Sequence, residues 1–294
     1  MVIVRLTGGL GNQMFQYAAG RALADRLGAE LLLDTRVFEH TLAFRAYTRR
    51  AYALAPFKLR AKLATAADLR NWPVWVVEIG LRLRLVRPLF RRWHFESAIT
   101  YDAGVGTLNH PVCLIGYWQS ERYFIDIADR IRADFTLSQP LAGANANLLA
   151  LAHSVHSVGL HVRRGDFISL DNAAQMHGLC SIEYYRHAIS LVRDRCPKCR
   201  FLVFSDDPVW ARAELPLDSS AVFVTGNDAS PELDLALMSA CKHHIIANSS
   251  FSWWAAWLGY SPEQIVIAPA PWYASNKLDA RDLAVSRWQY IGRV

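Results

Sequence analysis

Features that are missing from this chain of 294 residues exclude several classes of protein. The most apolar run, WPVWVVEIGLRLRLV, contains Glu78, Arg82 and Arg84 and is too short and too charged for a membrane span. The N-terminus, MVIVRLTGG, has neither the cationic start nor the apolar core of a signal peptide. Low-complexity tracts are missing and 52% of residues are hydrophobic, which excludes disordered and fibrous classes. We therefore expect a soluble, cytoplasmic globular protein.

Cysteine is scarce, and its five positions are scattered and odd in number. This pattern argues against a secreted disulfide framework and favours a reducing compartment. Two cysteines lie in the sequence CPKC, a spacing found in redox and zinc motifs, but no second Cys/His pair follows at ligand spacing. We expect the cysteines to be structural or incidental.

Acidic residues are in the minority, and their spacing is informative. The formal net charge of +6 favours an anionic partner, which leaves nucleic acid, a phosphorylated small molecule and a membrane surface open. No two aspartates are separated by one residue, so the D-x-D motif of metal-assisted nucleotide-sugar enzymes is absent. We predict no metal at the reaction centre.

The elements that are present predict two α/β halves. Residues 2–34 follow the order strand, glycine-rich turn, helix, strand, with Asn12 as the expected N-cap and Gly28 as the expected helix stop. From residue 158 onward, five short Val/Ile/Leu-rich strands alternate with helices, which is typical of a doubly wound parallel sheet. Between them lies a connection, TLSQPLAGANAN. We predict an N-terminal α/β lobe over residues 1–150 and a C-terminal Rossmann-type lobe over residues 151–294.

The stretch GLHVRRGDF, residues 159–167, includes the end of the first predicted strand of the second half, residues 158–162, and the turn after it. Ligands of such sheets bind beyond the carboxyl ends of the strands. Alternation along a strand places His161 and Arg163 on one face, so that Arg163 reaches the rim. Arg163 and Arg164 offer the paired donors that suit a diphosphate, while Asp166 is suited to orient an arginine or receive a proton. Taken alone, the stretch fits a solvated turn with an Arg/Asp ion pair equally well.

Further candidates follow the other predicted strands. Asn248, Ser249 and Ser250 are capping residues after the strand HHIIA, so a helix start with free N–H groups faces the same rim. Simple helix capping explains them too. We expect Asp206 and Asp207 of FSDD to cap the next helix.

Two more features leave alternatives open. Asp234, in a helix among apolar residues, is suited to accept two hydrogen bonds from a guanine edge, and a solvated helix face explains it equally. The tryptophans of SFSWWAAWLG lie at helical spacing, which usually means packing.

The glycine-rich turn of the first half permits close approach of a ligand to the backbone. Gly9, Gly11 and Asp34 nearly complete a dinucleotide-binding fingerprint, but Met14 replaces its third glycine. An NAD-dependent oxidoreductase is therefore an alternative, which stabilisation by NAD rather than GDP would support. A basic nucleic-acid-binding protein is another, although no recognisable module organises the basic residues.

Taken together, GGLGNQMFQYA, HVRRGD and NSSFSWWAAWLG resemble the α-1,2-fucosyltransferases of glycosyltransferase family 11 in order and spacing. The resemblance implies a GT-B-like fold of two Rossmann-type lobes with a cleft between them, acceptor on the N-terminal side and donor on the C-terminal side. It implies inverting, metal-independent transfer of L-fucose from GDP-β-L-fucose to the 2-hydroxyl of a terminal galactose, without a cofactor. The acceptor would be an oligosaccharide or a lipid-linked glycan, and no nucleic acid is expected.

The resemblance also assigns roles to residues. It places Arg163 on the β-phosphate and Asp234 at the guanine or ribose. The donor would further contact His161, Arg164, Asn248, Ser249, Ser250 and Phe251, and the donor sugar or acceptor would face Gly9, Gly11, Asn12 and Gln13. Asp166 is the predicted general base, with Asp34, Glu39 and His177 as alternatives.

Eukaryotic members of the family carry an N-terminal membrane anchor that this sequence lacks, which points to a bacterial-type cytoplasmic enzyme. The basic stretch LRLRLVRPLFRR, within residues 75–92, is either a contact with the inner face of the membrane or a solvated helix face.

Overall fold

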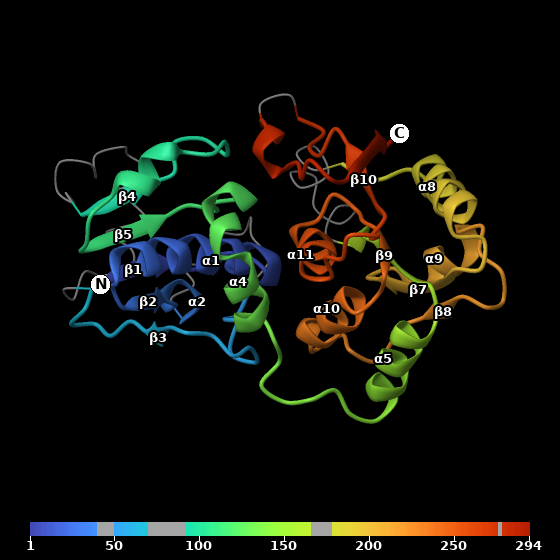
Figure 1. The fold of residues 1–294 in the computed structure, drawn as a ribbon, viewed down its shortest axis with the longest axis horizontal. Coiled ribbons are helices and arrows are strands. Elements are labelled where there is room, and N and C mark those ends of the chain that lie inside the picture. Colours follow the sequence, from blue (N-terminus) through green and yellow to red (C-terminus); the bar gives the residue numbers. More distant parts are fainter. Residues whose placement is uncertain (40–49, 70–91, 166–177, 276–277) are drawn as a thin grey trace. The chain divides into compact units, whose positions relative to one another are not determined.

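The computed structural model describes residues 1–39, 50–69, 92–165, 178–275 and 278–294 (Figure 1). The chain divides into two compact units, Met1–Thr136 and Leu137–Val294. The division lies in the predicted connection, but the predicted boundary after residue 150 falls inside helix α5 (Ala144–Ser154). This helix contacts α10 and β6 of the second unit, so it belongs with that unit.

The first unit is built on a parallel sheet of five strands in the order β3-β2-β1-β5-β4. The strands are β1 (Val2–Arg5), β2 (Leu31–Asp34), β3 (Lys62–Leu63), β4 (Trp93–Phe95) and β5 (Val112–Ile115). Ile3 pairs in register with Leu32 and Cys113, and these side chains form a core with Leu69 on one face. Val4 alternates to the opposite face, where the long helix α1 (Leu10–Leu27) packs against it at Gly20.

Helix α1 links β1 to β2, as the sequence predicted, but it begins three residues earlier than expected. Gly9, not Asn12, is its N-cap residue, and Asn12 lies within the first helical turn. The helix ends at Gly28, as predicted, where φ is +57°, a left-handed conformation that glycine adopts without steric cost. Among its described residues, this unit also contains α2 (Arg36–Glu39), η1 (Ala103–Thr107), η2 (Glu121–Tyr123), η3 (Ile125–Ile127) and α4 (Ala128–Asp134).

The second unit contains a parallel sheet of six strands in the order β11-β10-β9-β6-β7-β8. They are β6 (Ser157–Val162), β7 (Arg200–Ser205), β8 (Val222–Phe223), β9 (His243–Ile245), β10 (Val266–Ala270) and β11 (Gln289–Gly292). The first five were predicted, whereas β11 was not. The other elements are α8 (Ile182–Arg195), α9 (Pro208–Glu214), α10 (Pro231–Ser239), α11 (Ser250–Leu258) and η4 (Arg281–Leu283).

Helices cover both faces of this second sheet, which confirms the doubly wound prediction (Figure 1). Val158, Leu160 and Val162 of β6 join the core formed with α8. His161 alternates to the other face, where its ring lies 5.4 Å from that of Phe251 in α11. The three tryptophans of α11 are fully buried, as expected for packing residues. No helix in the described part of the chain is long and apolar enough to cross a bilayer.

Candidate functional site

The carboxyl ends of the second sheet bring most of the predicted residues together. All six strands are parallel, so their carboxyl ends share one edge. Strand β6 is central, between β7 and β9, and leads directly into Arg163, Arg164 and Gly165. The residues following β7 and β9 therefore flank the two arginines from either side. This edge of the sheet is called the donor rim below.

Both arginines are paired with carboxylates of the FSDD segment after β7. Nη1 of Arg163 lies 3.1 Å from Oδ2 of Asp206, and Nε of Arg164 lies 3.2 Å from Oδ2 of Asp207. Asp207 also caps α9, since its Oδ1 accepts a hydrogen bond from the amide of Trp210 at 3.1 Å. The capping prediction is thus confirmed for Asp207 and wrong for Asp206.

Asp206 instead organises the turn after β6. Its two carboxylate oxygens accept hydrogen bonds from the backbone amides of Arg164 and Gly165, at 2.8 and 3.0 Å. A Cβ on Gly165 would lie only 2.9 Å from Oδ2 of Asp206, so this close approach requires a glycine. The ion pair that the sequence left open is therefore present, and it is part of a fixed turn.

Arg164 is further held by an aromatic ring. Its guanidinium carbon lies 4.1 Å from the centroid of the Trp210 ring, a cation–π contact. The side chains of Arg163 and Arg164 are 26% and 20% exposed, so each guanidinium is positioned by protein contacts and still reached by solvent. Such pre-positioned cations suit a phosphate ligand.

His161 lies beneath the arginines and is almost fully buried. Burial, assisted by the charge of Arg163, lowers its pKa to about 3, so the imidazole is neutral at physiological pH. Its Nδ1 is buried and has no hydrogen-bond partner among the described residues. The hydroxyl of Tyr185 donates to the His161 carbonyl at 3.3 Å and so fixes the backbone there.

On the other side of β6, the residues that follow β9, Asn248 to Ser250, have different roles. Ser249 is the N-cap of α11, and its hydroxyl accepts a hydrogen bond from the amide of Phe251 at 3.3 Å. Ser250 is the first helical residue. Asn248 is buried, and its amide donates to the carbonyls of Gly178 and Trp272, at 3.0 and 3.2 Å. The capping prediction is therefore wrong for Asn248, which ties two loops together.

Asp234 forms a polar cluster that the sequence did not reveal. Its Oδ1 accepts a 2.7 Å hydrogen bond from the amide of Asn227, which exchanges two further bonds with Asn145 of α5. Burial raises the pKa of Asp234, although the bond from Asn227 opposes this effect. The carboxylate is therefore on the inner side of its helix, not on a solvated face.

In the first unit, two buried glutamines hold the glycine-rich turn. Gln13 donates to the carbonyls of Gly8 and Ala51 and accepts from the amide of Ala53, each at 2.9 Å. Gln16 accepts from the amide of Thr7 at 2.9 Å and donates to its hydroxyl and to the Gly116 carbonyl. The prediction that Gln13 faces a ligand is not supported, because its side chain is completely buried and engaged.

Two neighbouring residues of the glycine-rich turn are more exposed to solvent than Gln13. Gly9 and Asn12 are half-buried, whereas Gly11 is buried within the start of α1. Oδ1 of Asn12 accepts a hydrogen bond from the side chain of Gln119 at 2.9 Å.

The structure describes two of the four candidate general bases. Asp166 and His177 lie outside the described residues. Asp34 is buried and paired with Arg36 at 2.9 Å, which suits a structural role, while Glu39 is exposed at the end of α2.

The structure adds a histidine that the sequence reading missed. Nε2 of His94 in β4 lies 2.8 Å from Oδ2 of Asp102, an arrangement in which a carboxylate orients an imidazole. A histidine and an aspartate eight residues apart in the sequence do not by themselves predict that the two side chains interact.

A cavity of about 560 Å³ lies beyond the carboxyl end of β10. Its lining includes Trp272, Tyr273, Asp279, Arg281 and Tyr290. Neither Arg163 nor Arg164 is among its lining residues.

Comparison with known proteins agrees with the resemblance drawn from the motifs. The model of the family described as "Glycosyl transferase family 11" matches residues 101–292. An α-1,2-colitosyltransferase of Escherichia coli is 35% identical over 300 residues, covering 99% of both chains. Galactoside α-(1,2)-fucosyltransferase 1 of Saimiri boliviensis boliviensis is 28% identical over 260 residues, covering 85% of this chain and 63% of that protein. This chain belongs to glycosyltransferase family 11.

A solved structure shares the fold at low sequence identity. The NodZ α-1,6-fucosyltransferase, in a crystal structure soaked with GDP-fucose, aligns with a TM-score of 0.50 and 16% identity. The alignment covers 90% of this chain and 94% of that one.

Proposed function

We propose that this protein transfers L-fucose from GDP-β-L-fucose to the 2-hydroxyl of a terminal galactose, with inversion and without a metal. The acceptor in this proposal is a galactose-terminated oligosaccharide or lipid-linked glycan handled in the cytoplasm. The second unit binds the donor and the first unit the acceptor, in a GT-B-like pair with the reaction in the cleft between them. Membership of the family and the names of the relatives support the reaction class.

The observation that carries the proposal is the pair of positioned guanidinium groups on the donor rim. Arg163 and Arg164 are held by Asp206, Asp207 and Trp210 and remain partly exposed. The start of α11 follows the strand next to β6, so the positive end of its helix dipole adds to an anion-binding edge. Phosphate oxygens of a nucleotide sugar fit this combination of paired donors and helix start.

The chemistry follows from this charge arrangement. Inversion requires the acceptor hydroxyl to attack the anomeric carbon from the face opposite the diphosphate, so negative charge grows on the leaving phosphate as the glycosidic bond breaks. Arg163 and the helix start stabilise that charge, an effect of about 3 to 4 kcal/mol for a well-placed donor. Asp166 receives the acceptor proton in this proposal.

Colitose is a second candidate donor sugar. The colitosyltransferase relative is more similar to this chain than the fucosyltransferase of Saimiri, in identity and in the share of both chains that aligns. Colitose is L-fucose without its 3-hydroxyl, so a site that hydrogen-bonds this hydroxyl rejects GDP-colitose, while an apolar lining there accepts it.

A donor and acceptor screen tests the proposal. Purified protein is incubated with GDP-fucose, GDP-colitose, GDP-mannose or UDP-galactose and a β-galactoside, with and without EDTA, and the product linkage is read by NMR. We expect an α-1,2-linked product from GDP-fucose that EDTA does not reduce. Transfer from GDP-colitose alone would replace the sugar assignment, and no transfer to any galactoside would overturn the function. An EDTA-sensitive reaction that Mg²⁺ or Mn²⁺ restores and Zn²⁺ does not would refute the metal-independent mechanism.

A further inference from the structure

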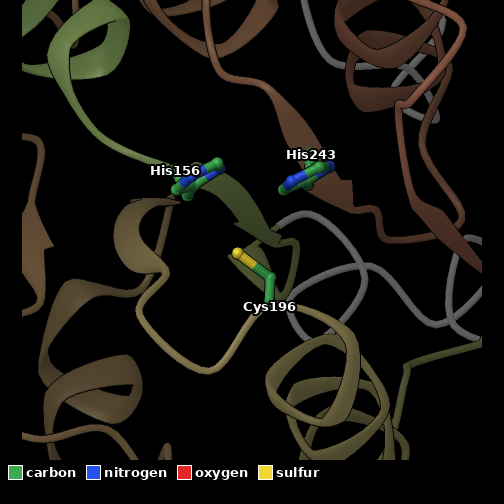
Figure 2. A group of neighbouring side chains, drawn as sticks. All are labelled: His156, Cys196 and His243. Carbon is green, nitrogen blue, oxygen red and sulfur yellow. The ribbon is translucent and has the colours of Figure 1, made fainter.

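At the edge of the second sheet opposite the donor rim, three metal-ligating side chains lie together. The ligand atoms of His156, Cys196 and His243 are all within 4.8 Å of one another. Figure 2 shows the Cys196 sulfur directed toward the space between the two imidazole rings. The three residues come from separate segments of the chain and are called the amino-edge cluster below.

Topology explains why these residues meet. His156 directly precedes β6, His243 is the first residue of β9, and β6 pairs with β9. Cys196 ends α8 just before β7, which pairs with β6 on its other side. The cluster therefore sits at the amino ends of three adjacent strands. Since His156 and Arg163 flank β6 and are seven residues apart, the cluster is roughly 20 Å from the donor rim, at about 3.3 Å per strand residue.

We propose that the amino-edge cluster binds a zinc ion that fastens the three strands together. Imidazole and thiolate are the ligands that Zn²⁺ selects, and Mg²⁺ and Ca²⁺ avoid such a set. In a tetrahedral zinc site the ligand atoms lie roughly 3.3 to 3.8 Å apart, so the three groups need to close by only about 1 Å.

In this proposal Cys199, whose sulfur lies outside the 4.8 Å group, turns toward the ion as the fourth ligand. The segment CPKC forms a tight turn in which the amide of Cys199 donates to the carbonyl of Cys196 at 3.0 Å. The two thiols lie close enough for a direct contact. With His156 and His243 they make a Cys2His2 set, of which sequence spacing showed only the C-x-x-C half.

Two energetic costs limit the affinity of the amino-edge cluster for zinc. Each cysteine releases its thiol proton to solvent, so binding weakens as the pH falls. The amide of Ile265 donates to Nδ1 of His243 at 3.1 Å. A metal on Nδ1 displaces this bond, and a metal on Nε2 leaves the ring proton on Nδ1, where the bond cannot form. Lys242 adds positive charge beside His243 and Glu263 adds negative charge there, so we expect moderate rather than extreme affinity.

The test uses cobalt as a spectroscopic substitute for zinc in the full-length protein. After reduction and removal of metals, Co²⁺ should bind at one ion per chain and give a thiolate-to-cobalt charge-transfer band, which Zn²⁺ abolishes and Mg²⁺ does not. Zn²⁺ should also raise the Tm. His156→Ala, which alters an exposed residue and should fold normally, and Cys196→Ser should lose the band at stoichiometric metal.

The matched control is His153→Ala, an exposed histidine three positions from His156 that is outside the cluster. This variant should keep the band and the Tm increase. No charge-transfer band in the reduced wild-type protein would overturn the proposal, as would a band that persists in His156→Ala and Cys196→Ser. A Cys199→Ser variant with an unchanged band would refute the role of Cys199. A Cys196–Cys199 disulfide that reduction does not convert into a cobalt site would show a redox pair instead.

Discussion

Arg163 and Asp206 form an ion pair across the carboxyl ends of β6 and β7, with Nη1 and Oδ2 3.1 Å apart. The same carboxylate accepts both backbone amides of the turn that follows Arg163. One side chain thus fixes the backbone of the turn and the direction of its first guanidinium. Asp206 acts through Arg163 in the proposed reaction and is a positioning residue.

Asp206→Asn should reduce kcat/KM for GDP-fucose about 10-fold or more, because the neutral amide loses the charge that aligns Arg163 and presents one acceptor oxygen instead of two. A tenfold loss corresponds to about 1.4 kcal/mol of transition-state stabilisation. Steady-state kinetics at varied donor concentration measures it.

Asp218→Asn is the matched control for this variant. Asp218 pairs with Arg193 at 3.2 Å, but both side chains are more exposed than the pair on the rim, and such surface pairs contribute little. Its kinetics should equal those of the wild type. If both variants lose activity alike, or if neither does, Asp206 has no positioning role.

Arg163→Lys should lower kcat about 100-fold or more while changing KM for the donor less. An ammonium group keeps the charge but not the planar fork that donates to Asp206 and to phosphate oxygens at once. A loss of this size is typical of removing one donor to a developing negative charge. Single-turnover measurement of fucose transfer isolates the chemical step, with Arg193→Lys as the control. A kcat near the wild-type value would contradict the assignment of Arg163 to the leaving phosphate.

Much of the fold was predictable because local signals agreed with it. The five Val/Ile/Leu-rich stretches that alternate with helices predicted five strands of the second sheet, and Gly28 predicted the end of α1. Strand β11 was missed because QYIG near the chain end has no alternation or turn signal of its own. Its partner β10 stabilises it through pairing, which is a tertiary effect.

The site was predictable where it follows a strand directly and unpredictable where it depends on distant partners. The position of Arg163 at the end of β6 follows from alternation along the strand. The roles of Gln13 and Gln16 do not, because their partners near Ala51 and Gly116 are remote in sequence. The same reason hid the cluster of Asn145, Asn227 and Asp234 and concealed the histidines that accompany CPKC.

Asp234→Asn should reduce the preference for GDP over IDP. If the carboxylate accepts hydrogen bonds from N1–H and the 2-amino group of guanine, the wild type binds GDP about 10-fold or more tighter than IDP, which lacks that amino group. The variant loses a charged acceptor and should bind the two nucleotides within a few-fold. Isothermal titration calorimetry gives all four dissociation constants. Equal weakening toward both nucleotides would assign Asp234 to the ribose instead of the base.

Two buried histidines should make the fold acid-sensitive. Burial lowers the pKa of His161 to about 3 and that of His244 to about 4, from an ordinary value of 6.5. In the unfolded chain both protonate as the pH falls below about 6.5, while the folded protein keeps them neutral. The unfolded state therefore binds more protons, and the free energy of unfolding falls as the pH drops from 6.5 toward 4.

Each histidine should cost about 2 kcal/mol of stability at pH 5 relative to pH 7, since one pKa unit corresponds to 1.36 kcal/mol. Urea denaturation at pH 5, 6 and 7 measures the slope. His161→Asn and His244→Gln should each be less stable than the wild type at pH 7 and show a shallower decline with acid, because one proton-binding difference is removed. His187→Gln, at an exposed position of α8, should retain the full decline. An unchanged slope in His161→Asn would mean that this imidazole is already protonated or solvated in the folded protein.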